Sequence, residues 1–432
     1  MRLYLIFLLF RLINSKIIYV RDFGIINNEN SINASIQNGN SFYDAIKYAS
    51  YGDTIIISEN ETLYYIPSEE YIENINNILI QIDGKIILYN DTSLWEKTSS
   101  DTYFNAIDIR NSNNLTITGN GTIYGQGYTW WKEFLKGEIV RERPSLINID
   151  SCTDVIIENI TLLNSPRFNI YANYVLRFVT RNMKIWVDVK QQKKLLNSLK
   201  IPIFPFNTDG VDVKGKQIHI YNMTISNYDD SVAVKPSKNK GLFLDNQNMS
   251  CSEDILIENI NVKYGVGLSI GSVSTNNNYC IRNVIFQNIH ADTPIKFIYI
   301  KTEEGSDHKS IIDNITYQNM SATKPILWPI YIGPQQQKEP DGTGSGIWPP
   351  TNPFVEIQNI YLKNIHITET IFEAGLLRCN ISNPCKNIIF ENVVVKGKIK
   401  KNAYVCDKNN SVLGTYDKYT SPQINSCGLV EI

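Results

Sequence analysis

The chain has 432 residues, of which 43% are apolar and 19% are charged, and its 41 basic residues nearly balance its 43 acidic residues. This composition supplies enough apolar side chains for a large buried core and argues against bulk disorder. The near-neutral balance excludes a general nucleic-acid-binding protein, which would carry a basic domain or stripe. The length would suit two or three ordinary domains. A chain built of repeats escapes that estimate, because each unit extends one continuous core.

The first residues predict a secretory signal peptide over residues 1–15. Met1-Arg2 is followed by an apolar run to Phe10 and then by Arg11-Leu-Ile-Asn-Ser15. A positive end, a short apolar run and small polar residues are typical of such leaders. The run is too short to span a bilayer, and a buried N-terminal strand is the alternative. We therefore expect a secreted, extracellular protein with no membrane partner after processing, and a single domain over residues 16–432.

The cysteines fit secretion, and their odd count of seven leaves one thiol unpaired. Two pairs close short loops near the C-terminus, and a third pair is a further candidate. The expected pairs are Cys379–Cys385, Cys406–Cys427 and, third, Cys251–Cys280. Cys152 is then the candidate for a free, buried thiol. A reduced cytosolic protein with scattered cysteines is the alternative. Asn-x-Ser/Thr sequons, including those at Asn159, Asn222 and Asn319, add the expectation of a glycoprotein.

One phrase recurs along the chain: a β-prone stretch, then Asn, then an apolar residue and more β-branched residues. It reads Val-Ile-Ile-Glu-Asn-Ile-Thr-Leu at 155–162 and Ile-Leu-Ile-Glu-Asn-Ile-Asn-Val at 255–262. The shared asparagines are Asn159, Asn182, Asn222, Asn259, Asn288, Asn319, Asn364 and Asn392. Repeats of a few tens of residues indicate a solenoid, a propeller or an array.

The pattern favours an all-β, single-stranded parallel β-helix of about ten coils. Period-two alternation of β-branched residues excludes helical repeats, and the Trp-Asp marks of a WD40-type propeller are absent. Coils of a β-helix stack about 4.8 Å apart. We expect each shared Asn to point inward and to hydrogen-bond its equivalents above and below. Chance repetition in an Asn-rich chain is the alternative. A short amphipathic helix at 190–200 and a turn-rich loop at 333–346 interrupt the pattern.

Two acidic clusters are candidates for chemistry. One is Asn207-Thr208-Asp209-Gly210-Val-Asp212, and the other is Asn227-Tyr-Asp229-Asp230. About one coil separates Asp209 from Asp229, so their carboxylates would lie side by side. Glycosidic hydrolysis needs two carboxyl groups, and crowding raises the pKa of at least one. Adjacent strand residues face opposite sides, so Asp229 and Asp230 share a site only at a bend. A solvated turn or a cation site is the alternative.

These motifs, in this order, resemble the signature of glycoside hydrolase family 28, the polygalacturonases. The similarity continues in Gly265-Val-Gly-Leu-Ser-Ile-Gly271 and Ile298-Tyr-Ile-Lys301, and upstream in Gly125-Gln-Gly127. It implies a right-handed parallel β-helix of the pectin-lyase-like type. It also implies inverting hydrolysis of α-1,4-galacturonosyl links in cell-wall pectin, without a metal or organic cofactor.

The resemblance also implies roles for the acids. Asp229 would be the general acid, and Asp209 and Asp230 would position and activate water. Inversion would then require an acid–base gap of roughly 6.5–9.5 Å.

Two residues depart from the family pattern. Val266 stands where the family has a His, and Tyr299 stands where it has an Arg. That Arg would have held a substrate carboxylate as a fork, which neither Tyr nor Lys reproduces. We expect Asn207, Lys235, Tyr299 and Lys301 to contact the sugar. A packing role for Tyr299 and a solvated role for the lysines are the alternatives. Trp130-Trp131 is expected in the core rather than on the substrate.

Three functions remain open on the sequence. The leading hypothesis is a polygalacturonase-like glycosidase, a monomer whose partner is a pectic polysaccharide. Its substrate alternative is rhamnogalacturonan, because Tyr299 and the missing His resemble that branch of the family. The second hypothesis, favoured by Val266 and Tyr299, is a glycan-binding β-helix without catalysis. The third is a pectate lyase, which would use bound calcium and a basic residue.

Overall fold

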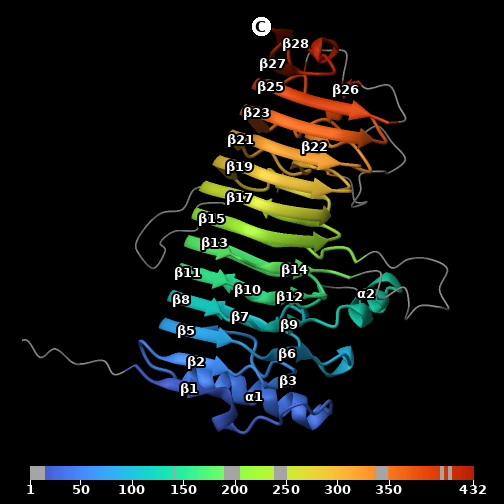
Figure 1. Ribbon diagram of the computed structural model, residues 1–432. Helices are drawn as coiled ribbons and strands as arrows, with labels where there is room; N and C mark the ends of the chain where they lie inside the picture. Colours follow the sequence, from blue (N-terminus) through green and yellow to red (C-terminus); the bar gives the residue numbers. More distant parts are fainter. Residues whose placement is uncertain are drawn as a thin grey trace, which may run out of the picture.

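The computed structural model describes residues 15–139, 142–188, 205–237, 251–336, 349–398, 403–406 and 411–432. Its strands stack one above another from the N-terminal to the C-terminal end (Figure 1). Every pairing between its named strands is parallel. The expected parallel β-helix is therefore confirmed. Residues 1–14 of the expected leader, the expected helix at 190–200 and most of the expected loop at 333–346 lie outside the described residues.

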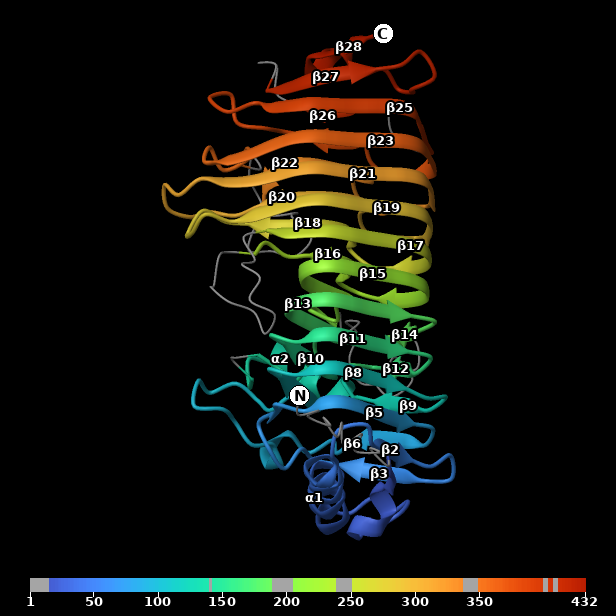
Figure 2. The same cartoon turned by 90° about the vertical axis from the view of Figure 1, so that its left-hand side faces the viewer.

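The longest strands form one stack along the whole molecule (Figure 2). In order, its members are β1 (Ile17–Tyr19), β2 (Thr54–Ile57), β5 (Asn76–Ile82), β8 (Asn113–Thr118), β11 (Thr153–Glu158), β13 (Ile170–Arg181), β15 (Val211–Asn227), β17 (Ser252–Tyr264), β19 (Cys280–Asp292), β21 (Ser310–Thr323), β23 (Val355–Thr370), β25 (Cys385–Gly397), β27 (Val412–Tyr416) and β28 (Leu429–Glu431). The stack holds a few more rungs than the ten coils expected.

Two further stacks of shorter strands complete each coil. One contains β4 (Ile72–Glu73), β7 (Ile107–Arg110), β10 (Ile147–Asp150), the first residues of β13 and β15, β16 (Asp230–Val234), β18 (Gly267–Val273), β20 (Ile298–Thr302), β22 (Ile330–Gln335), β24 (Gly375–Leu377) and β26 (Tyr404–Cys406). The other contains β3 (Thr62–Tyr65), β6 (Lys85–Leu88), β9 (Thr122–Tyr124), β12 (Thr161–Leu163) and β14 (Lys184–Trp186), and continues through the ends of the long strands.

The core is made of apolar columns that run along the axis. Because successive coils pair in register, equivalent inward residues lie directly above one another. One column contains Phe178, Ile218, Ile255, Val284, Ile315, Ile360 and Ile388, and each of these residues is at most 2% exposed. Burying such a side chain contributes about 1.5–3 kcal/mol. The recurrent β-branched phrases are therefore the source of the core.

The shared asparagines do not point inward, and that expectation is wrong. Asn159, Asn222 and Asn259 are exposed and adopt the left-handed conformation, with φ of 67°, 53° and 56°. Asn tolerates this conformation better than most residues do, so it marks the corner where each long strand bends. The expected ladder does form, on the outside: Asn364 Nδ2 donates to Asn319 Oδ1 at 3.1 Å, and Asn392 Nδ2 to Asn364 Oδ1 at 3.0 Å.

A second left-handed corner precedes the first by five residues in each coil from β11 to β25. Asp254 precedes Asn259 in this way, and Asn314 precedes Asn319. The two corners bracket the four-residue stretch of each long strand whose first residue belongs to the core column. Asn and Asp also recur in the sequence at this second corner. The pattern is weaker than that of the shared asparagines, because residues such as Arg177, with φ of 52°, also occupy the second corner.

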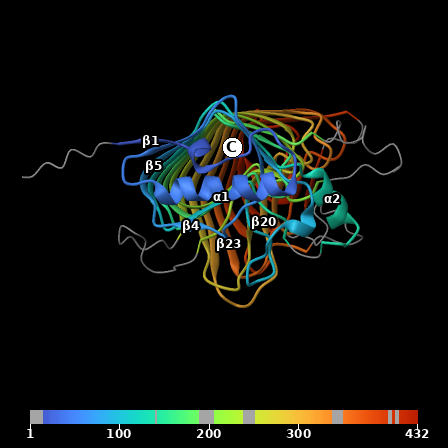
Figure 3. The same ribbon diagram turned by 90° about the horizontal axis from the view of Figure 1, so that it is seen from below.

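Helices cover the N-terminal end and one side of the stack. Helix α1 (Ile32–Tyr48) crosses the bottom of the solenoid (Figure 3), and Ser31 caps it by accepting a hydrogen bond from the Ala34 N–H. Helix α2 (Tyr128–Leu135) buries both Trp130 and Trp131, which confirms their place in the core. The short 3₁₀ helices are η1 (Val20–Phe23), η2 (Thr92–Leu94) and η3 (Asn425–Cys427). Among the described residues, no helix has the length and apolar character needed to cross a membrane.

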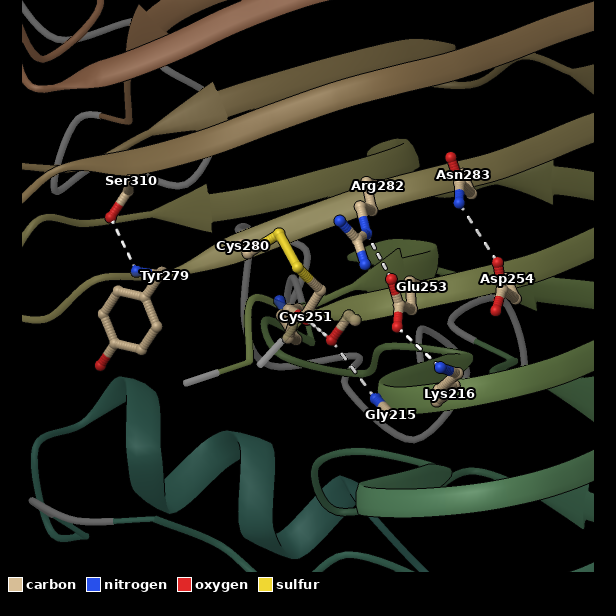
Figure 4. The surroundings of a disulfide bond; sticks show 12 residues. Gly215, Lys216, Cys251, Glu253, Asp254, Tyr279, Cys280, Arg282, Asn283 and Ser310 are labelled. Atoms are coloured by element: carbon tan, nitrogen blue, oxygen red, sulfur yellow. Dashed lines mark hydrogen bonds and ion pairs between the residues drawn. A yellow bond between two sulfur atoms is a disulfide. The ribbon is translucent and has the colours of Figure 1, made fainter. Parts of the chain in front are cut away.

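The three expected disulfides are present, and Cys152 is free and buried, as predicted. The Cys251–Cys280 bond ties the start of β17 to the start of β19, the next rung (Figure 4). Beside it, the Glu253 carboxylate lies between Lys216 and Arg282, the first at 2.9 Å. Covalent and ionic contacts thus join three successive coils at this edge.

Candidate active site

Three aspartates meet at the N-terminal ends of strands β15 and β16. Asp209 precedes β15, Asp229 precedes β16, and Asp230 begins β16. Each offers a carboxylate oxygen within 4.8 Å of the others. They line a hollow of about 560 Å³, which we call the acidic cleft. Its other described lining residues are Phe134, Phe168, Phe206, Asn207, Lys235, Val266, Ser272, Lys301, Glu303 and Gln336.

The side chain of Asn227 explains how adjacent aspartates face one site. Its Nδ2 donates to the carbonyl oxygens of Asp229 and Asp230, both at 2.8 Å, and to that of Thr208 at 3.1 Å. The Asn227 Oδ1 accepts from Ser231 Oγ at 3.0 Å. This fully buried amide holds the bend between β15 and β16, so the strict alternation of a strand does not apply there. The sequence predicted a bend but not the residue that makes it.

Asp230 is the carboxylate held in the charged form. Its Oδ2 lies 2.8 Å from Lys301 Nζ and 3.7 Å from Lys235 Nζ, and its Oδ1 accepts from Ser269 Oγ at 2.6 Å. Burial alone would raise the pKa of Asp230, but the two lysine charges and these hydrogen bonds lower it below its usual range. Asp230 is therefore ionised near neutral pH.

The pKa values of Asp229 and Asp209 are raised, in the opposite direction to that of Asp230. Burial and the nearby Asp230 charge raise the pKa of Asp229, although backbone N–H groups of Asn207 and Asp230 donate to its carboxylate at 2.8 and 2.9 Å. Burial, together with the charges of Asp212 and Asp229, raises the pKa of Asp209 well above its usual range. The site thus pairs one ionised carboxylate with two that hold protons more readily, as acid–base catalysis requires.

Asp212 is a fourth carboxylate of the site and pairs with Lys235, which lines the acidic cleft. Asp212 is fully buried on β15, and Lys235 Nζ lies 3.4 Å from its Oδ2. Burial raises the pKa of Asp212 to about 6 against the opposing charge of Lys235. Burial would lower the pKa of Lys235, but Asp212, Asp230 and the other aspartates raise it, so this amine stays charged.

Arg143 is a site residue that the sequence did not single out. Its Nη2 donates to Phe206 O at 2.7 Å and to Asn207 Oδ1 at 3.0 Å, and its guanidinium stacks on the Phe134 ring at 4.2 Å. Burial and the Arg167 charge lower the pKa of Arg143 to about 9, against the charges of Asp229 and Asp209. Arg143 therefore fixes the segment whose Asn207 N–H contacts Asp229. In the sequence, only the Arg-Pro dipeptide at 143–144 could have drawn attention to this residue.

The predicted sugar contacts divide into two groups. Asn207, Lys235 and Lys301 line the acidic cleft, but Tyr299 does not. Tyr299 is 2% exposed and packs with Val266, Leu327, Trp328, Tyr331 and Leu376 in a separate buried cluster. Its ring lies 4.4 Å from Lys301 Nζ and 4.2 Å from Lys296 Nζ. The expected direct contact with sugar is thus replaced by a supporting position behind Lys301.

The spacing of the carboxylates also differs from expectation. One carboxylate oxygen of each of the three aspartates lies within 4.8 Å of the other two. This distance is shorter than the gap of roughly 6.5–9.5 Å that is expected between the acid and the base of an inverting enzyme. Such a spacing would also suit a divalent cation, but the Lys301 ammonium already supplies positive charge to Asp230 at 2.8 Å. The cleft is therefore built around a lysine and carboxylates.

A parallel β-helix with paired carboxylates and lysines in a cleft has the groups that acid–base hydrolysis of a glycosidic bond requires. Comparison with known proteins identifies the family. Residues 63–415 match the profile of glycosyl hydrolases family 28, and the chain belongs to that family. The polygalacturonase of Juniperus ashei is 28% identical over 384 residues, which are 85% of this chain and 64% of that protein. The chain thus spans just under two thirds of that relative's length.

Solved structures share the fold. The endo-xylogalacturonan hydrolase of Aspergillus tubingensis superposes with a TM-score of 0.69 and 17% identity, and covers 96% of this chain and 98% of its own. The polygalacturonase of Erwinia carotovora ssp. carotovora gives a TM-score of 0.60 at 17% identity, over 90% of this chain and 96% of its own. These likenesses support the parallel β-helix fold of the described residues.

Proposed function

We propose that this protein hydrolyses α-1,4-galacturonosyl links in pectin. The observation that carries the proposal is the cluster of Asp209, Asp229 and Asp230 in an accessible cleft, with their pKa values pushed in opposite directions. Family membership and the polygalacturonase of Juniperus ashei support this substrate class. Rhamnogalacturonan is the alternative pectic substrate.

The carboxylates divide the chemistry by their proton affinity. Asp229, whose pKa is raised, gives its proton to the glycosidic oxygen as the bond to the anomeric carbon breaks. Asp230, which is kept ionised, takes a proton from the attacking water while the oxygen of that water bonds to the anomeric carbon. Asp209 orients the water. Asn207, Lys235 and Lys301 bind hydroxyl and ring oxygens of the sugar.

Inversion of configuration is part of the proposal and rests on the family resemblance rather than on the spacing of the carboxylates. Proton NMR of the freshly released reducing end measures it. A β-anomer formed first from the α-linked polymer supports inversion. An α-anomer formed first contradicts inversion but is still consistent with hydrolysis.

Replacement of Asp229 by Asn tests the function. Loss of a general acid lowers the rate of reducing-end release from pectic polymers by about 10²–10⁴-fold. Asp254→Asn is the matched control, because Asp254 is exposed and does not line the acidic cleft. Equal rates for the wild type and Asp229→Asn would refute the role, and product absorbance in the ultraviolet with loss of activity in chelator would indicate a lyase instead.

We also propose that the protein is secreted and glycosylated and acts as a monomer. The three disulfides support an oxidising compartment. Exposed sequon asparagines such as Asn159 and Asn222 are accessible to glycan transfer. Recovery from the medium, a mass decrease on enzymatic deglycosylation and the elution volume on gel filtration test these three points.

A further inference from the structure

The cations of the acidic cleft are already engaged with carboxylates of the protein. Lys301 Nζ lies 2.8 Å from Asp230, and its side chain is only 4% exposed. Lys235 Nζ lies between Asp212 at 3.4 Å and Asp230 at 3.7 Å. A substrate carboxylate would have to compete with these buried pairs for either ammonium, which is costly because an unpaired buried charge remains.

A second hollow adjoins the cleft on the same face of the sheet. It has a volume of about 280 Å³, and Phe168 lines both hollows. We call it the arginine groove after three of its lining residues, Arg110, Arg143 and Arg167. On its floor, Asn148 pairs with Tyr171 on the next rung, and Tyr171 pairs with Asp212 on the rung after that. Because rungs lie about 4.8 Å apart, a polymer that runs along this face passes from the groove into the cleft.

Arg143 is the cation of this groove that has unused donors. Its Nη2 donates to two uncharged oxygens, Phe206 O at 2.7 Å and Asn207 Oδ1 at 3.0 Å. Its Nε and Nη1 are buried and have no hydrogen-bond partner among the described residues. Burial lowers the pKa of this guanidinium to about 9, so it stays charged near neutral pH. A buried charge with unused N–H groups is stabilised by an anion that supplies acceptors.

The other two arginines of the groove are already occupied. Arg167 makes a two-point ion pair with Glu142, at 2.6 and 2.9 Å. Arg110 makes another with Asp108, at 2.9 and 3.0 Å. These pairs also neutralise two of the acidic side chains that line the groove, and the third, Asp150, accepts hydrogen bonds from neighbouring side chains. An incoming carboxylate therefore finds its free donors at Arg143.

We infer that Arg143 binds the carboxylate of a uronate unit that lies in the arginine groove, next to the unit held at the three aspartates. This inference rests on the proposed function. It names the cation that recognises substrate charge in a chain where Tyr299 stands in place of the expected Arg. The free carboxyl group that matters for binding is then on the neighbouring sugar and not on the sugar at the cleavage point.

Binding of defined oligomers measures this recognition without turnover. Calorimetry on the Asp229→Asn protein compares Kd for a galacturonate tetramer with Kd for its fully methyl-esterified form. We expect the acid to bind about tenfold more tightly than the ester, because a charge-assisted hydrogen bond is lost on esterification. Adding Arg143→Gln should abolish this preference, and Arg143→Lys should keep part of it. A purely structural role of Arg143 would weaken both ligands equally and leave their ratio unchanged.

A second variant keeps every contact of Arg143. Asn148→Asp places a negative charge in the groove, so we expect it to weaken binding of the acid several-fold with little change for the ester. Asn261→Asp is the matched control, because it adds the same charge at an exposed strand position that lines neither hollow. If Arg143→Gln does not fold, Asn148→Asp decides the question.

The outcomes separate this inference from the proposed function. An acid–ester preference that is absent from the parent protein, or that is unchanged in either folded groove variant, overturns the inference. Release of reducing ends from polygalacturonate by the wild type is scored independently. Hydrolysis with an unchanged preference leaves the proposed function intact, whereas Arg143-dependent binding without any hydrolysis overturns the proposed function alone.

Discussion

Replacement of Lys301 by Met measures how much the buried ion pair holds the site together. The variant keeps most of the aliphatic stem but leaves Asp230 without its nearest cation, in a place where both side chains are at most 4% exposed. Breaking a buried pair on one side costs about 3–5 kcal/mol, because the remaining charge is left unpaired. That loss is a large part of the 5–15 kcal/mol that typically stabilises a folded protein.

Lys363→Met is the matched control. Lys363 Nζ lies 2.9 Å from Glu391 Oε1, almost the same distance as in the Lys301 pair, but the two side chains are 46% and 50% exposed. An exposed pair of this kind contributes about 0–1 kcal/mol. Urea unfolding followed by tryptophan fluorescence compares both variants with the wild type, and the midpoints and slopes convert to free energies of unfolding.

The pH dependence separates the ion pair from simple packing. Asp230 has a lowered pKa in the folded protein, so its pairing stabilises the fold above the unfolded-state pKa of about 3.9 and is lost as the pH falls through the lower folded value. We expect the difference between wild type and Lys301→Met to be full near pH 7 and to shrink below about pH 4. A difference that stays constant over this range, or that equals the cost of Lys363→Met, would refute the reasoning.

Three further predictions address the corner, the disulfide and the arginine. Asn222→Ala should destabilise the fold by about 1 kcal/mol more than Asn222→Gly in the same urea assay, because Ala is strained at φ 53° and Gly is not. The double variant Cys251→Ser/Cys280→Ser should lose about 3.5 kcal/mol, since the bond closes a segment of 29 residues; no change in midpoint would contradict this. Arg143→Gln should lower kcat more than it raises KM, and should move the alkaline limb of the activity profile to higher pH. The reason is that loss of the positive charge raises the pKa of the acid Asp229 further; an unmoved limb would contradict it.

The sequence predicted the features that repeat or that depend on close spacing. Successive β-branched phrases gave the solenoid, because identical inward positions in register produce one core. Cys379–Cys385 and Cys406–Cys427 followed from short separations near the C-terminus, whereas Cys251–Cys280 was only a further candidate. The direction of the shared asparagines could not be predicted from alternation, because the period of two stops at a residue with positive φ. Both inward and outward placements would give the same spacing in sequence.

The burial of Tyr299 shows a second limit of prediction from the sequence. Tyr299 and Lys301 are two residues apart on β20 and therefore face the same side of the strand. Lys301 lines the acidic cleft, but Tyr299 is covered by Leu327 and Trp328, which precede β22 in the next coil. Which part of a strand face remains open depends on the connection that folds over it, and the sequence of the strand itself does not contain that information.

The two departures from the family pattern are one structural change rather than two. Val266 and Tyr299 lie in the same buried cluster, and the Tyr299 ring contacts Lys296, whose side chain is fully buried. A His at the first position or an Arg at the second would place a polar or charged group beside Leu327, Trp328 and a buried ammonium, where the Glu373 carboxylate already accepts a hydrogen bond from Trp328 Nε1 at 3.0 Å. Each replacement is compatible with the other and with the apolar wall of the cleft.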